Sequence, residues 1–146
     1  MRIRRVKKTD LEEIAKLYKR MYSKKPYCER WNEKNLMIKL KENIGWMKFF
    51  VAEENKKIIG FIMFYIYLWS RGWNAYIEDV GVVEEYRRQG VGKRLIKFAI
   101  SFCKKKKARI IVLNTNTKAK AINIYKKFGF KKTKNFIQMT KNLYKK

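Results

Sequence analysis

Apolar residues recur at two different spacings along the chain, and each spacing predicts one type of element. A helical spacing predicts helices over residues 11–22, 33–44, 91–106 and 119–128. Alternating or short apolar runs predict strands over residues 2–7, 49–52, 58–69, 75–82, 110–113 and 136–143. Polar turns separate the central strands, so hairpins come first and a strand–helix–strand crossover follows. This order predicts a mixed sheet.

The pattern predicts a single α/β domain over residues 1–146, with a mostly antiparallel sheet flanked by about four helices. The chain has 146 residues, which are enough for one hydrophobic core and too few for two. One proline and seven glycines leave no room for a long linker. Hydrophobic residues make up 47% of the chain, which argues against disorder although 34% are charged.

The amino terminus is charged and has no apolar stretch behind it, so we expect no secretory signal. The longest apolar run, residues 58–69, is too short to span a bilayer. Cys28 and Cys103 lie far apart, as in a cytoplasmic protein with reduced thiols. Histidine is absent, which removes the commonest general base and metal ligand. We therefore expect no metal and no membrane association.

The net charge of +26 predicts a positive field that attracts phosphates, acidic proteins or nucleic acid. The charge is spread along the chain and is mostly lysine, so a compositional bias explains it as well as a partner does. A basic nucleic-acid-binding domain is one alternative function. The sequence lacks a helix-turn-helix, zinc or RNP-type motif, so any such binding is expected to be weak and non-specific.

Residues 84–92 read Glu-Glu-Tyr-Arg-Arg-Gln-Gly-Val-Gly, directly after a predicted strand and before a predicted helix. Gly90 and Gly92 lack a Cβ, so backbone amides can approach a ligand oxygen there. The helix that follows contributes unpaired N–H donors and the positive end of its dipole. Arg87, Arg88 and Lys93 add positive charge. This combination predicts a diphosphate site, although an isolated Gly-x-Gly more often only turns the chain.

The motif Arg87-x-x-Gly90-x-Gly92 after its strand resembles the central motif of the GNAT superfamily of acyl-CoA N-acyltransferases. A second match lies downstream, where Ala121-Ile-Asn-Ile-Tyr125-Lys-Lys-Phe-Gly129-Phe resembles the end of the coenzyme-binding half of that family. The resemblance covers residues 49–130 and weakens in the first half of the chain. It implies a GNAT-like fold in which strands four and five splay apart.

The resemblance also implies how acetyl-CoA binds. Backbone groups of Val80 and Val82 would pair with the pantetheine arm in the slot between the splayed strands. The pyrophosphate would be held by the turn: Arg87, Arg88, Gln89, Gly90, Val91, Gly92 and Lys93. Many members carry an asparagine seven residues before the conserved tyrosine, where this chain has Lys118, and Asn116 is the nearest candidate for that contact. A CoA-binding domain without activity is therefore a second alternative.

Acetyl transfer to an amine requires two proton movements. An alkyl ammonium, with a pKa of about 10.4, must lose a proton before it attacks a thioester. The departing thiolate gains from a proton donor, and the family commonly places a tyrosine there, which implies this role for Tyr125. The other interpretation of Tyr125 is a core residue. Some relatives carry a strand-five glutamate where this chain has Leu113.

Glu78 and Asp79 are the remaining acidic candidates, on the predicted strand 75–82. Alternation along a strand predicts that they point to opposite faces, with Glu78 beside Tyr76, Val80 and Val82. We assign Glu78 as the base, acting through water, and Asp79 as a contact for the substrate ammonium. A simple salt bridge to a lysine is the alternative for either carboxylate.

These observations predict a cytoplasmic N-acetyltransferase that transfers acetyl from acetyl-CoA to a primary amine of a small molecule or a protein, directly in a ternary complex. Acetyl-CoA and an amine acceptor are the expected partners, and a homodimer is left open.

Overall fold

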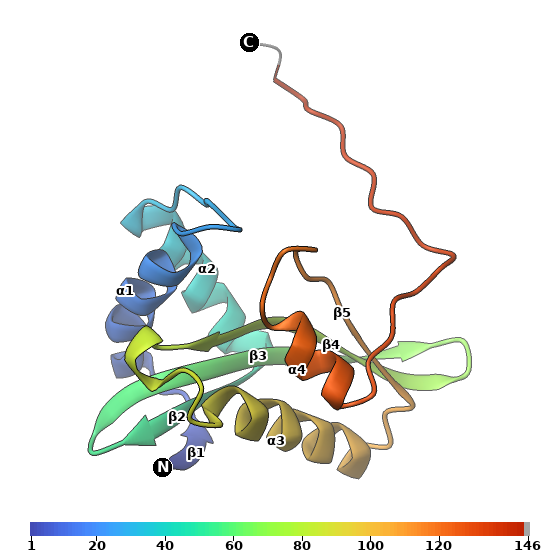
Figure 1. Cartoon of the computed structure of the whole chain (residues 1–146), viewed down its shortest axis with the longest axis horizontal. Helices are drawn as coiled ribbons and strands as arrows, with labels where there is room; N and C mark the ends of the chain where they lie inside the picture. Colours follow the sequence, from blue (N-terminus) through green and yellow to red (C-terminus); the bar gives the residue numbers. More distant parts are fainter. Residues whose placement is uncertain (145–146) are drawn as a thin grey trace.

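The computed structural model describes residues 1–144 and contains one five-stranded sheet (Figure 1). Its strands lie in the order β1 (Arg2–Arg5), β2 (Lys48–Glu54), β3 (Lys57–Trp69), β4 (Gly72–Val82) and β5 (Ile110–Leu113). Neighbouring strands are antiparallel except for β4 and β5, which are parallel. The predicted mixed and mostly antiparallel sheet is confirmed.

Helices cover both faces of this sheet. They are α1 (Leu11–Tyr22), α2 (Glu33–Trp46), α3 (Val91–Lys105) and α4 (Ile122–Lys127), with 3-10 turns at Lys8–Asp10 and Glu84–Tyr86. α1 and α2 pack on one face, in a cluster that includes Ile14, Leu40 and Phe61. α3 and α4 pack on the other face, around Phe64 and Leu95. We call these the α1/α2 face and the α3/α4 face.

The long apolar run of β3 follows from its central position. Phe61 and Met63 are buried against α1 and α2, whereas Ile62 and Phe64 are buried against α3. A strand that is covered on both faces carries no polar alternation. The turn into β3 uses Asn55 and Lys56, both with positive φ, as a two-residue hairpin requires.

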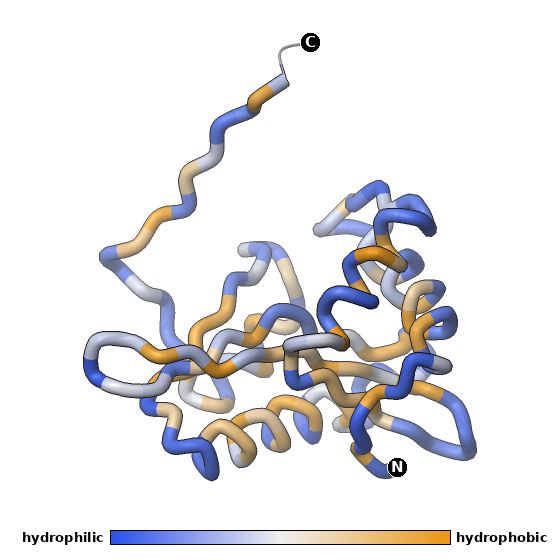
Figure 2. The backbone as a smooth tube through the Cα atoms, turned by 180° about the vertical axis from the view of Figure 1, so that it is seen from behind, coloured by the Kyte–Doolittle hydropathy of each residue, from blue (hydrophilic) through white to orange (hydrophobic). Residues whose placement is uncertain are grey.

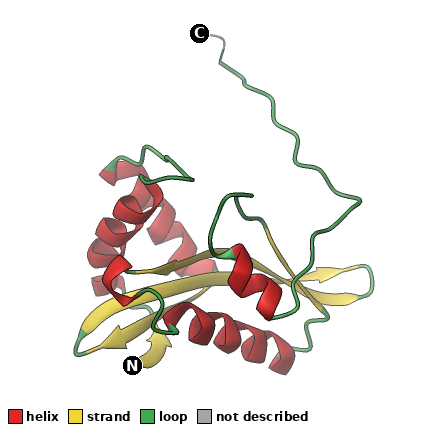
Figure 3. Cartoon of the chain, in the orientation of Figure 1, coloured by secondary structure: helices red, strands yellow, loops and turns green. Residues whose placement is uncertain are grey.

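The strand predicted over residues 136–143 is wrong for this structure. The segment contains no strand and leads away from the body of the protein (Figures 1 and 3). The large apolar side chains between residues 136 and 144 are about 80% exposed or more: Phe136, Ile137, Met139, Leu143 and Tyr144. An alternating pattern shows that a segment is able to form a strand, but a strand forms only where tertiary structure supplies a partner strand. In the structure this segment has no partner strand.

Candidate functional site

The edge of β4 that faces β5 is open over its second half. The two strands pair from Asn74–Ile110 to Ile77–Leu113, while β4 continues to pair with β3 as far as Val82, opposite Gly60. Within residues 1–144, no strand pairs with that side of β4 beyond Ile77. The strands therefore separate, as the family fold implies. Val80 and Val82, the predicted contacts of the pantetheine arm, lie along this open edge.

A β-bulge marks the point where β4 and β5 separate. Met63 of β3 pairs with Asp79, and the next residue, Phe64, pairs with Ile77, so Glu78 is an extra residue in β4. A bulge interrupts the alternation of side chains. Glu78 and Asp79 consequently share the α1/α2 face, whereas Val80 and Val82 pack toward α3 and α4. The prediction that the two carboxylates point to opposite faces is wrong, because the bulge is not visible in the sequence.

Asp79 is almost fully enclosed and is held by two hydroxyl groups from α1. Tyr22 donates to Oδ1 at 2.9 Å and Tyr18 donates to Oδ2 at 3.1 Å. Burial raises the pKa of Asp79 to about 6, although nearby Lys39 and both tyrosines act against this rise. Burial also raises the pKa of Tyr18 and of Tyr22, so both phenols keep their protons and remain donors. Asp79 is thus a carboxyl group that titrates close to neutral pH.

A lysine ammonium already lies at the two carboxylates. The Nζ of Lys39, from α2, is 3.5 Å from Asp79 Oδ2 and 3.6 Å from Glu78 Oε1. It also lies 5.9 Å from the centre of the Tyr18 ring, within the range of a cation–π contact. The Lys39 side chain is 21% exposed and that of Glu78 is 32% exposed, so solvent reaches the pair from the Glu78 side. The arrangement stabilises an ammonium group with two carboxylates and an aromatic ring.

The predicted diphosphate turn lies at the amino terminus of α3. Gly90 has φ +83° and caps the helix, and the helical bond from Arg94 N to Gly90 O closes the first turn. The amides of Val91, Gly92 and Lys93 precede this bond and have no acceptor inside the helix. Arg88 also has a positive φ of 62°, so consecutive left-handed and helical residues curve the backbone into a concave turn. The geometry suits an anionic ligand.

Two side chains form hydrogen bonds to the backbone next to this turn. Arg87 donates through Nε to the carbonyl of Val82 at 3.2 Å, and Gln89 donates to the carbonyl of Glu85 at 3.0 Å. These side-chain hydrogen bonds stabilise the turn. The contact of both residues with the coenzyme, made by Gln89 through its backbone amide, stays a prediction.

The acidic residues before the turn are paired with cations. Lys24 donates to Glu84 at 2.7 Å, and Arg20 donates to Glu85 at 2.9 Å. The hydrogen bond from Lys24 is the main reason that the pKa of Glu84 lies below its usual value. These exposed pairs contribute little to stability. Their effect is that the two carboxylates repel an anion at the turn less than free carboxylates would.

Tyr125 lies on α4 and packs beside Phe130, with 5.8 Å between the ring centres. Burial, with smaller effects from Tyr27 and Asp79, raises the pKa of Tyr125 to about 12. Its phenol therefore stays protonated at neutral pH.

Asn116 connects the two halves of the site. Its Oδ1 accepts from the amide of Lys118 at 2.9 Å, and its Nδ2 donates to the carbonyl of Pro26 at 3.4 Å. The loop after β5 is thereby tied to the loop after α1. Leu113 packs into the core on the α3/α4 face, so β5 supplies no carboxylate at the position where some relatives have one.

Sequence reasoning missed three residues that the structure adds to the site. Tyr18 counts as an apolar position of the first predicted helix and Tyr22 as its last residue, and neither pattern indicates what the hydroxyl groups bind. Lys39 was overlooked, although it falls between Leu36 and Leu40 on the buried side of the second helix. A lysine at such a position usually has a buried partner. A lysine among the apolar positions of this helix was therefore the feature of the sequence that could have identified Lys39.

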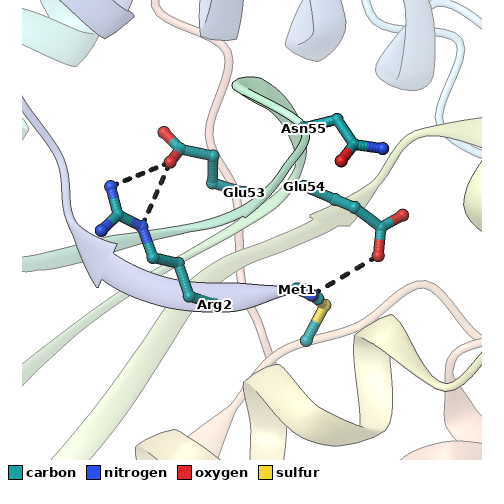
Figure 4. Close-up of a pocket in the computed structure, with 5 residues that line it drawn as sticks. All are labelled: Met1, Arg2, Glu53, Glu54 and Asn55. Carbon is teal, nitrogen blue, oxygen red and sulfur yellow. Dashed lines mark hydrogen bonds and ion pairs between the residues drawn. The ribbon is translucent and has the colours of Figure 1, made fainter.

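A surface pocket lies elsewhere. It has a volume of about 460 Å³ and lies around the β2–β3 turn, beside the first residues of the chain (Figure 4). Arg2 and Glu53 form an ion pair in it, and the terminal amine of Met1 lies near Glu54. None of the predicted site residues line this pocket, so it does not change the assignment.

Comparison with known proteins identifies the protein family of this chain. Residues 11–130 match the model of the acetyltransferase (GNAT) family. The chain belongs to this family. An uncharacterized N-acetyltransferase of Methanocaldococcus jannaschii is 32% identical over 155 residues, which cover 97% of this chain and 66% of that protein. The thialysine N-epsilon-acetyltransferase of Mus musculus is 37% identical over 76 residues, 49% of this chain and 44% of that protein.

A solved structure shares the whole fold. A predicted acetyltransferase of Clostridium acetobutylicum, determined with acetyl-CoA, superposes with a TM-score of 0.76 at 18% identity and covers 95% of each chain. The chain spans two thirds or less of the length of the two sequence relatives above. No helix among residues 1–144 is both long and apolar enough to cross a membrane.

Proposed function

We propose that this protein is an acetyl-CoA-dependent N-acetyltransferase that acts on a primary amine of a small molecule or a protein, by direct transfer in a ternary complex. One observation carries the proposal. The open edge of β4 leads from the amino terminus of α3 to the paired carboxylates of Glu78 and Asp79. An anionic coenzyme and a cationic acceptor therefore have complementary sites at the two ends of one strand segment.

The residues present fit acetyl-CoA. The free amides at the start of α3 and the left-handed Gly90 provide donors for a diphosphate, and Arg88 and Lys93 add charge. On the β5 side, β4 has no strand partner at Val80 and Val82, so its free backbone groups there offer hydrogen bonds to an extended amide-containing arm, although the carbonyl of Val82 already accepts one from Arg87. When bound, acetyl-CoA supplies the acetyl group as a thioester. Asn116 gives one Nδ2 hydrogen to the carbonyl of Pro26 and keeps a second one that can be donated to the coenzyme.

The acidic pair suits the acceptor. Asp79 is ionised at neutral pH and can hold an ammonium group, as it holds that of Lys39. Glu78 is the more exposed carboxylate, and it takes a proton from the amine through water. The amine nitrogen then forms a bond to the carbonyl carbon while the carbon–sulfur bond breaks, and the second proton that the nitrogen loses passes to solvent water. Tyr125, protonated at neutral pH, donates its proton to the departing sulfur and regains one from solvent.

The acceptor class follows from Lys39. Its ammonium stands on a flexible alkyl chain between two carboxylates and a tyrosine ring, and a lysine-like or terminal alkylamine has the same chemistry. The mouse relative acts, by its name, on the ε-amine of thialysine, which supports this class.

Mass spectrometry of a panel of amines and peptides incubated with acetyl-CoA tests the proposal. We expect a mass increase of one acetyl group on alkylamines, and none on amides or on matched compounds whose amine is already acetylated. Calorimetry first establishes that acetyl-CoA binds. Folded protein that fails to bind acetyl-CoA contradicts the function, whereas binding without transfer to any amine supports a CoA-binding domain that is inactive.

A further inference from the structure

The outer half of the β3–β4 hairpin carries a row of aromatic side chains. Helix α2 ends at Trp46, whereas β3 continues to Trp69, and Figure 1 shows the hairpin extending beyond the helices. The ring centres are 4.9 Å apart between Trp46 and Tyr65, 5.9 Å between Tyr65 and Tyr67, and 6.3 Å between Tyr67 and Trp69. Tyr76 of β4 stacks on Tyr65 at 5.4 Å. We call these five residues the aromatic row.

The aromatic row lies on the α1/α2 face and is open to solvent. Alternation along β3 places Tyr65, Tyr67 and Trp69 on one face of the sheet, and Tyr65 packs against the α1/α2 cluster. Trp46 and Trp69 are 57% and 65% exposed, and the three tyrosines are partly exposed. Single exposed apolar residues need no explanation, whereas a contiguous set of uncovered rings marks a binding surface.

Opposite charges lie at the two ends of the aromatic row. At one end, the β-bulge places Glu78 and Asp79 next to Tyr76 on the same face. At the other end, Arg71 lies in the turn of the hairpin, and Arg109 donates through Nη1 to the Arg71 carbonyl at 2.6 Å. Both arginines are exposed, and Figure 2 shows hydrophilic colour at the tip of the hairpin. The surface is therefore acidic, then aromatic, then basic along its length.

The dimensions of this surface fit an extended peptide. Met63, which pairs with Asp79, and Trp69 are six positions apart on β3, so the surface is about 20 Å long. Side chains on one face of an extended chain repeat about every 7 Å. The ring spacings of 5.9 and 6.3 Å along β3 are close to this repeat, so alternate side chains of a peptide can each contact one ring.

We propose that the aromatic row binds the chain of a peptide acceptor. The amine of this peptide lies at Glu78 and Asp79, apolar or aromatic side chains follow at alternate positions, and an acidic side chain lies near Arg71 and Arg109. The inference rests on the proposed function for the position of the amine, and it narrows the acceptor from any alkylamine to a peptide. Contacts between aromatic rings stabilise a complex beyond the area that they bury.

Two tryptophans on opposite faces of the hairpin provide the test. The peptide Lys-Ala-Phe-Ala-Phe-Ala-Glu, amidated at its carboxyl end, should bind wild type in calorimetry without acetyl-CoA. Trp69→Ala should weaken this binding roughly ten-fold. Trp73→Ala is the matched control and should bind as wild type does, because Trp73 is 47% exposed but pairs with Leu68 on the α3/α4 face. Equal losses in both variants, or a loss in neither, overturn the proposal. Circular dichroism confirms that each variant is folded.

Changes in the peptide test the chemistry of the occupant. Replacing both phenylalanines by serine should weaken binding roughly ten-fold, because the ring contacts are lost. Replacing the glutamate by glutamine should weaken it several-fold, because a charged contact with the arginines is lost. Equal affinities of the phenylalanine and serine peptides overturn the proposal. Equal affinities of the glutamate and glutamine peptides overturn the role of Arg71 and Arg109.

Rates of acetyl transfer separate this inference from the proposed function. The value of kcat/KM for the peptide should exceed that for butylamine, and Trp69→Ala should lower only the peptide value, through KM. Equal values for the two acceptors overturn the peptide inference and leave the N-acetyltransferase function intact. Peptide binding that depends on Trp69, without transfer to any amine, overturns the function and retains the binding surface. Light scattering that shows a dimer of wild type but a monomer of Trp69→Ala assigns the row to a second copy and overturns the proposal.

Discussion

The most informative single residue is Asp79, because its protonation changes near neutral pH. Burial raises its pKa to about 6, so it is ionised above that value and loses its charge as the pH falls through it. We expect activity on an amine to fall with Asp79 protonation, because the ammonium contact is lost. In Asp79→Asn this acidic limb of the pH–rate profile should disappear. Its kcat/KM at neutral pH should drop roughly 10- to 100-fold, since a hydrogen bond to a charged group is worth about 1.5–3 kcal/mol.

Glu84→Gln provides the control for that experiment. Glu84 is an exposed carboxylate whose partner is Lys24, outside the acidic pair. Its pH–rate profile should match that of wild type. An acidic limb that survives unchanged in Asp79→Asn assigns it to another group and removes Asp79 from the acceptor site.

A substitution at Tyr125 tests the chemical step separately from coenzyme binding. Tyr125→Phe keeps the ring that packs beside Phe130 but removes the proton donor. The turnover rate should fall by roughly 10²–10⁴-fold, the usual range for a general acid, while acetyl-CoA affinity by calorimetry stays within about two-fold. An unchanged rate would mean that positioning of amine and thioester supplies the acceleration by itself.

The roles assigned to these residues from the sequence stay predictions, whereas their geometry can be compared with the structure. Few acid–base groups remain in a chain without histidine, so Glu78 was assigned as the base and Asp79 as the ammonium contact, and the family resemblance implied the acid role of Tyr125. The sequence could not predict that Glu78 and Asp79 share a face, since a bulge depends on how two strands align. The hydrogen bonds from Tyr18 and Tyr22 to Asp79 could not be predicted either. The pattern of an amphipathic helix is the same whether its tyrosine hydroxyls contact a carboxylate or water.

At the scale of elements, the turn before α3 gives a sharp test. Gly90→Val places a branched side chain at φ +83°, beside the amides expected to bind diphosphate. Acetyl-CoA affinity should fall at least about ten-fold, and the backbone strain should also cost about 1–2 kcal/mol of stability. Gly129→Val is the matched control, since Gly129 has φ +86° and equally open surroundings at the end of α4. It should lose similar stability while coenzyme affinity is retained. Equal losses of affinity in both variants would show that the effect is only strain.

Most helices and strands followed from the spacing of apolar residues, and the errors have physical causes. Helix α4 begins three residues later than predicted, at Ile122, because residues 119–121 form turns first. The strand expected at 136–143 lacks a partner in the structure. Local spacing decides whether a segment suits a helix or a strand, whereas long-range pairing decides whether the strand forms.

At the scale of the whole molecule, charge predicts a salt dependence. A formal charge of +26 and a cationic turn attract an anionic coenzyme. The affinity for acetyl-CoA should therefore fall several-fold as ionic strength rises, as measured by calorimetry at a series of salt concentrations. Desulfo-CoA, which keeps the phosphates, should show the same slope. An affinity that does not change with salt concentration would mean that the pantetheine arm, and not the phosphates, determines the binding of acetyl-CoA.

The same charge predicts how nucleic acid behaves. Lysine–phosphate contacts give weak binding that is independent of sequence and lost steeply with salt. Electrophoretic mobility shifts with several unrelated duplexes should therefore agree with one another at each salt concentration. A tight complex selective for one sequence at physiological salt would favour the alternative of a nucleic-acid-binding domain.

The position of Lys39 has a consequence for the release of product. In the proposed acceptor site, an incoming ammonium must displace the Lys39 ammonium from Glu78 and Asp79, and a tethered group competes at high effective concentration. Acetylation turns the acceptor into a neutral amide, which no longer competes with that ammonium. Lys39 can then return to the carboxylates and drive the product out. The protein would thus tolerate its own acetylated product at concentrations far above those at which it binds the free amine, and product-inhibition kinetics would show this directly.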